Sequence, residues 1–205
     1  SVLMGQRGAA AAFMASKYVF PGGALDPEDA LARLAQPLDA VTMARLAAEP
    51  REGSQATPDA LAAAALRDLA EETGLLTGQP GPAPAGWDHY ANAGLAPDAS
   101  ALIYVFRAIT PPGRTRRFDA RFLLLDADRL HGDREDFSNA CDELSHLHWV
   151  PLTEARALDL PFITEVVLAE LAALLHAAGD GPLEQPERVP FFDNRGANPR
   201  FTRIG

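Results

Sequence analysis

The chain has 205 residues, with 28 Asp and Glu against 18 Lys and Arg, and a formal net charge of −10. This length suits one domain that buries a core without staples. A single cysteine, Cys141, excludes an internal disulfide framework, and no apolar run reaches the roughly 18 residues of a membrane span. The acidic balance argues against broad nucleic-acid binding. Because the N-terminus lacks the pattern of a signal peptide, we expect a cytoplasmic protein.

The first quarter of the chain predicts short elements. Residues 2–6 and 17–20 have the composition of two short strands. Pro21-Gly22-Gly23 then breaks the chain. Residues 27–48 carry Leu, Ala and acidic residues at weak helical spacing, and Pro37 divides this stretch into two short helices.

The most regular segment is residues 59–73, which predict a helix that begins with Asp59 as its N-cap and stops at Gly74. Residues 77–86 are rich in Pro and Gly and predict an irregular loop. The rest of the chain predicts three strands (100–109, 117–126 and 147–152), a helix at 164–178 with Thr164 as its N-cap, and a hairpin of strands at 189–192 and 201–203. This mixed order predicts an α/β (α+β) fold in one domain over residues 1–205, with the helix and hairpin forming a C-terminal region at 164–205.

The end of the helix at 59–73 carries the chemistry. Asp68, Glu71 and Glu72 stand at i, i+3 and i+4, a spacing that predicts three carboxylates on one face. The helix dipole disfavours anions in the last turn by roughly 0.3–1 kcal/mol each. Hard oxygen ligands in such a cluster suit Mg²⁺, which would cancel their mutual repulsion. For this segment alone, an acidic helix end without a ligand is the alternative interpretation.

Read together with Phe20-Pro21-Gly22-Gly23, this segment resembles the Nudix box, G-x5-E-x7-R-E-U-x-E-E-x-G-U, where U is a bulky aliphatic residue. The matching positions are Gly23, Arg67, Leu69, Glu71, Glu72, Gly74 and Leu75. Two departures stand out. Asp68 replaces a Glu, and the acid of the first half falls at Asp29 or Glu28, so that residues 30–59 would be an insertion that splits the box.

The resemblance implies a Nudix-type α/β/α sandwich with a mixed central sheet, and hydrolysis of a diphosphate linkage with Mg²⁺ or Mn²⁺. Glu71 and Glu72 would be metal ligands, Asp68 a weaker or water-mediated ligand, and Arg67 would orient the carboxylates. Metal ions serve such a reaction because they neutralise diphosphate charge and clamp the attacking and leaving oxygens.

The resemblance also implies a general base outside the box. Glu143, six residues before Trp149, is the candidate, with Asp142 and Glu135 as alternatives.

Further segments resemble a Nudix subfamily that includes peroxisomal coenzyme A diphosphatases of animals and bacterial relatives. They are Gln6-Arg7, Phe13-Met14, Val19 to Gly23, Leu25-Asp26, Arg117 to Asp119, Arg121-Phe122 and Leu160 to Thr164. Within the coenzyme A signature, Arg7 stands at the matching position, whereas Gly8, Ala12 and Ser16 depart from it. Arg7 and the glycines Gly22 and Gly23 are therefore the expected substrate-binding residues.

These features leave more than one function open. The first hypothesis is a diphosphatase of a nucleoside diphosphate derivative, with coenzyme A or an acyl-coenzyme A among the candidate substrates. A ligand-sensing Nudix-like domain and a nucleotide-end or RNA-end pyrophosphohydrolase are the alternatives. The expected partner is a small diphosphate molecule, with no membrane and no nucleic acid, and a homodimer stays open. Trp87 and Tyr90 are candidates for the mouth of a pocket.

Overall fold

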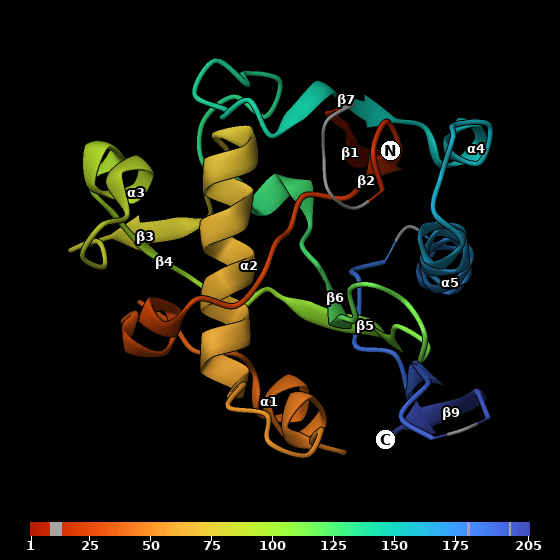
Figure 1. The fold of residues 1–205 in the computed structure, drawn as a ribbon. Coiled ribbons are helices and arrows are strands. Elements are labelled where there is room, and N and C mark those ends of the chain that lie inside the picture. Colours follow the sequence, from red (N-terminus) through yellow and green to blue (C-terminus); the bar gives the residue numbers. More distant parts are fainter. Residues whose placement is uncertain (9–13, 180, 197) are drawn as a thin grey trace.

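A computed structural model describes residues 1–8, 14–179, 181–196 and 198–205. These residues form nine strands and five α-helices (Figure 1). Phe13, which belongs to the predicted resemblance, and Ala12, which departs from the coenzyme A signature, lie outside the described residues. The strands are β1 (Val2–Arg7), β2 (Tyr18–Val19), β3 (Gly78–Pro80), β4 (Leu95–Pro97), β5 (Ile103–Ile109), β6 (Asp119–Leu124), β7 (Leu144–Val150), β8 (Val189–Asp193) and β9 (Arg200–Ile204). The helices are α1 (Ala40–Ala47), α2 (Pro58–Thr73), α3 (Asp88–Ala93), α4 (Leu152–Ala155) and α5 (Phe162–Ala178), with 3-10 turns η1 (Pro27–Leu31) and η2 (Ala127–Arg129).

The strands form three sheets. A four-stranded sheet has the order β6-β5-β8-β9, in which β5 and β8 run parallel and the other neighbours antiparallel. A three-stranded antiparallel sheet has the order β2-β1-β7, and β3 pairs with β4. The four-stranded sheet is therefore mixed, as the resemblance implies.

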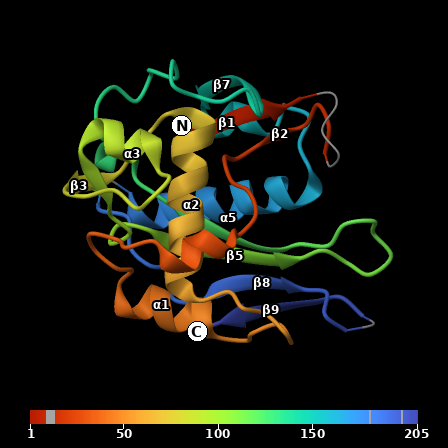
Figure 2. The ribbon, with the colours of Figure 1, turned by 60° about the vertical axis from the view of Figure 1, so that its left-hand side comes forward.

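Helices α2 and α5 lie on opposite sides of the four-stranded sheet (Figures 1 and 2). On one face, Ala63 and Leu66 of α2 pack with Tyr104 and Phe191 of the sheet. On the other face, Phe106 belongs to a separate core with α5. This arrangement confirms the predicted α/β class, with a helix on each face of a mixed sheet.

The starts of two helices differ from the prediction. Helix α2 begins one residue earlier, and Thr57, not Asp59, is its N-cap: its hydroxyl accepts the Ala60 amide at 3.2 Å. Pro58 occupies the first helical position, where its missing N–H costs nothing. Helix α5 follows Pro161 directly, so Thr164 lies buried in its first turn and is not a cap.

Local sequence signals missed the elements that depend on distant partners. The predicted loop at 77–86 contains β3, which is a strand because it pairs with β4. Strand β7 begins at Leu144 instead of residue 147, because Leu144 pairs with Arg7 at the end of β1. Helices α3 and α4 were not predicted.

Among the residues that the structure describes, none of the helices has both the length and the apolar character that crossing a membrane requires.

We expect Thr57→Ala to lower the free energy of unfolding by about 1 kcal/mol, because it removes the side-chain acceptor that caps α2. Asp59→Ala is the matched control: it removes only a favourable charge in the first turn, worth about 0.5 kcal/mol. Urea unfolding of both variants measures the difference. Equal losses, or a larger loss for Asp59→Ala, would contradict the assignment of Thr57.

Candidate active site

Four segments meet at the C-terminal end of α2. Strand β1 ends at Arg7, and its pairing with Leu144 puts Glu143 beside that end. Strand β2 pairs with β1 and leads into Gly22 and Gly23, whose amides lie against the last two turns of α2. The structure therefore brings together residues that lie more than 60 positions apart in the sequence.

Two buried carboxylates form the centre of the site. Asp68 and Glu72, one helical turn apart, are 6% and 4% exposed. The amide of Gly23 donates to Asp68 Oδ2 at 2.6 Å, and the amide of Gly22 donates to Glu72 Oε2 at 2.8 Å. Two consecutive amides thus fix two consecutive helix-face acids, because each hydrogen bond to a charged acceptor is strong and directional.

Glycine suits both amide donors, for different reasons. Gly22 has φ +148°, a backbone conformation that residues with a side chain rarely adopt. A Cβ on Gly23 would stand 3.1 Å from both carboxylate oxygens of Asp68. The Pro-Gly-Gly break predicted from sequence is therefore the place where backbone approaches the acids.

Arg67 ties η1 to α2. Its Nε and Nη2 donate to the two oxygens of Asp29 at 2.8 and 3.0 Å, and its Nη1 donates to Asp68 Oδ1 at 2.7 Å. Asp29 is buried, whereas Glu28 is exposed, so the structure joins Asp29 to the site. The hydrogen bonds to Asp29 raise the pKa of Arg67 above its ordinary value, which keeps the guanidinium charged.

Glu71 is far more exposed than the buried acids Asp68 and Glu72. Its side chain is 48% exposed and accepts from Arg67 Nη1 at 3.2 Å. Its backbone carbonyl accepts the amide of Cys141, in the loop before β7. Arg67 Nη1 donates to both Asp68 and Glu71, so these two acids share one donor on the same side of α2.

Arg7 and Glu143 form an ion pair at the edge of the site. Arg7 Nη2 lies 3.0 Å from Glu143 Oε1, with the side chains 23% and 51% exposed. Both charges act on Glu72: Glu143 raises its pKa and Arg7 lowers it. Asp142 and Glu135, the alternatives to Glu143, are exposed.

Burial gives the two central acids unusual proton affinity. Loss of water raises the pKa of Asp68 to about 6, against the opposing charge of Arg67 and the Gly23 hydrogen bond. Burial likewise raises the pKa of Glu72 to about 7, with the charges of Asp68 and Glu143 adding to the rise. The site favours protons or another cation over two bare carboxylates.

A divalent cation fits this donor set. Within the described part of the chain, no three His, Cys, Asp or Glu side chains come together as a preformed metal site. Asp68 and Glu72 nevertheless supply hard oxygens that each keep unused acceptor capacity, in a setting that penalises their uncompensated charge. Mg²⁺ is commonly held by one or two carboxylates together with substrate phosphates, so two acids suffice.

A small cavity of about 170 Å³ lies on the Arg67 and Glu71 side of α2. Trp87 and Tyr90 line it, with ring centroids 5.4 Å apart, as the sequence predicted for a pocket. Both aromatic residues are buried, so they form its wall and offer no open stacking face.

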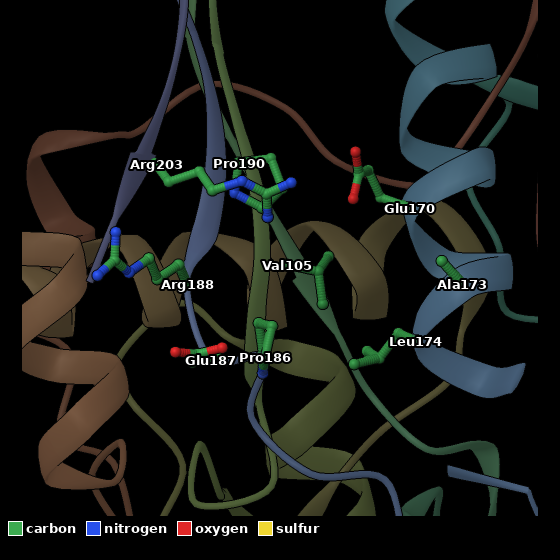
Figure 3. A pocket seen from close by; sticks show the side chains of 9 residues that line it. All are labelled: Val105, Glu170, Ala173, Leu174, Pro186, Glu187, Arg188, Pro190 and Arg203. Carbon is green, nitrogen blue, oxygen red and sulfur yellow. The ribbon is translucent and has the colours of Figure 1, made fainter. Parts of the chain in front are cut away.

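A larger cavity, of about 480 Å³, lies between α5 and the start of β8 (Figure 3). Glu170 and Leu174 of α5 face Arg203 of β9 and Arg188 across it. None of the predicted site residues lines this cavity, so it is separate from the candidate active site.

Comparisons with known proteins give an informative similarity to a solved structure. Neither the protein-family models nor the curated proteins contain a match to the chain. Among solved structures, the chain is similar to a NUDIX hydrolase from Alicyclobacillus acidocaldarius, with a TM-score of 0.53 and 29% identity over 83% of this chain and 82% of that one. This similarity supports the Nudix superfamily and, within it, a hydrolase of the Nudix type.

We expect the metal-free protein to lose stability as the pH rises. Unfolded Asp and Glu titrate near 3.8 and 4.5, whereas folded Asp68 and Glu72 hold their protons to about 6 and about 7. Between these pKa values the folded state binds more protons than the unfolded state. The stabilisation that these protons provide is complete below the unfolded-state pKa values, and it is lost as the pH rises through the folded-state pKa values. Urea unfolding in the presence of a chelator, between about pH 4 and about pH 8, measures the decline.

Glu72→Gln is the matched variant for this measurement. It removes one of the two raised acids, so its stability should fall less steeply with pH. At the alkaline end of the range, added Mg²⁺ should restore the stability of the wild-type protein and should stabilise Glu72→Gln less. A wild-type profile that is flat or rises across this range would contradict the buried acid pair.

Proposed function

We propose that the chain is a Mg²⁺- or Mn²⁺-dependent diphosphatase of the Nudix type that cleaves the diphosphate linkage of a nucleoside diphosphate derivative. The observation that carries this proposal is the buried pair of Asp68 and Glu72, held by the amides of Gly22 and Gly23. The similarity to a Nudix hydrolase supports the reaction class.

Each residue has a defined task in this proposal. A divalent cation held by Asp68 and Glu72 would neutralise the diphosphate and stabilise its developing charge. Arg67 keeps the two acids in place through Asp68 and the buried Asp29. Glu143 takes one proton from a water molecule whose oxygen bonds to a phosphorus atom. The bridging phosphorus–oxygen bond breaks, and the leaving phosphate departs with its electron pair.

The substrate and the box insertion extend this proposal. Asp29 contacts Arg67, which supports it as the acid of the first half of the box and residues 30–59 as the insertion. Coenzyme A is the first substrate to test, because Arg7 stands at its signature position and lies beside the site. The protein would act in the cytoplasm on a small molecule.

We expect Glu72→Gln to lower kcat for Mg²⁺-dependent diphosphate hydrolysis more than about 100-fold, because it removes a charged ligand. Glu71→Gln should cost much less, because Glu71 is half-exposed and turned to Arg67. Product formation from coenzyme A, ADP-ribose and dinucleoside polyphosphates, with and without chelator, measures both.

Glu170→Gln is the control for the loss of one acid, since Glu170 lines the separate cavity. Equal activity of Glu72→Gln and the wild type would overturn the metal role of Glu72. A wild type that binds these diphosphates without cleaving any would favour the ligand-sensing alternative.

A further inference from the structure

The ion pair of Arg7 and Glu143 occupies the two groups that the reaction needs free. Arg7 is the cation next to the site that could reach an incoming phosphate, and Glu143 is the candidate base. In the structure they bind each other at 3.0 Å. While they are paired, Arg7 occupies one carboxylate oxygen of Glu143, and Glu143 occupies a donor of Arg7 that a phosphate oxygen could otherwise use.

The pair is also incompletely satisfied. Arg7 Nε is buried and has no hydrogen-bond acceptor, so this donor has lost its water without gaining a partner. Only Nη2 of Arg7 contacts Glu143. Arg67 contrasts with it, because Arg67 uses all three of its nitrogens. Arg7 can therefore gain hydrogen bonds by moving to a better acceptor, whereas Arg67 would only lose them.

We propose that Arg7 is a latch that substrate binding opens: it pairs with Glu143 in the free protein and transfers to a diphosphate oxygen when substrate binds. Glu143 is then free to accept the proton of the attacking water. This inference rests on the proposed diphosphatase function and adds how the base is released.

The exchange is favourable because the partners differ in charge and exposure. A diphosphate offers several negatively charged oxygens, and a guanidinium binds phosphate through two parallel donors. Glu143 is 51% exposed, so water can solvate its carboxylate once Arg7 leaves. Exposed ion pairs hold their partners weakly, so the latch opens at little cost.

The test measures binding separately from turnover. The probe is the methylene-bridged analogue of ADP, with Mg²⁺, titrated by calorimetry into the wild type, Arg7→Gln, Glu143→Gln and the double variant. Under the latch, Arg7→Gln weakens binding about tenfold, the worth of a charged hydrogen bond. Glu143→Gln tightens binding several-fold, because Arg7 no longer has a competing partner, while kcat for the cleaved substrate falls.

The double variant separates the latch from simple charge repulsion. If Glu143 acts through Arg7, the double variant binds the analogue as weakly as Arg7→Gln alone. If Glu143 merely repels the anion, its replacement tightens binding equally in both backgrounds, and the latch is overturned. Unchanged binding in Arg7→Gln overturns it as well.

A matched ion pair controls for unspecific effects. Arg195 and Glu49 lie 2.5 Å apart, with side chains 26% and 54% exposed, nearly the values of Arg7 and Glu143. Arg195→Gln and Glu49→Gln should leave analogue binding at the wild-type level. A wild type that fails to bind the analogue would contradict the diphosphatase proposal itself, whereas wild-type binding without coupling between Arg7 and Glu143 would remove the latch alone.

Discussion

The set of ion pairs made by the partly buried guanidinium of Arg67 is the interaction on which the site depends. It neutralises part of a cluster of acids from two segments, the turn at Asp29 and the helix at Asp68, that lie almost 40 residues apart. Without a cation at this point, several carboxylates would meet in a region with little water, at a cost far above that of any single hydrogen bond. Arg67 therefore links η1, through Asp29, to the acids Asp68 and Glu71 of α2.

The amides of Gly22 and Gly23 complete this arrangement from the opposite side. Backbone donors satisfy one oxygen each of Asp68 and Glu72 but leave their negative charge largely uncompensated, as the raised pKa values of both acids indicate. A structure that only required stability would replace such a pair with apolar groups. The net charge of −10 thus includes Asp68 and Glu72, two acids that the fold keeps close together although they repel each other.

The sequence predicted the fold class and the candidate site residues, but it predicted the geometry of these residues less well. The Pro-Gly-Gly break, the helix ending at Gly74 and the hairpin at the C-terminus are local signals, and the structure confirms them. Strand β3 and the early start of β7 arise from pairing with distant residues, which no local pattern encodes. Helical spacing predicted Asp68, Glu71 and Glu72 on one face, but it does not encode that Asp68 and Glu72 are buried while Glu71 stays half-exposed.

Two arginines flank the central carboxylates, and their environments assign them different tasks. Arg67 has a 13% exposed side chain with every nitrogen bound, so moving it would strand buried acids. Arg7 has one bound nitrogen and one buried, unsatisfied nitrogen, and its partner is half in water. A fixed cation such as Arg67 can hold the acids in place but cannot change partner when a ligand binds. The loosely held Arg7 can exchange Glu143 for an incoming anion, as the proposed latch requires.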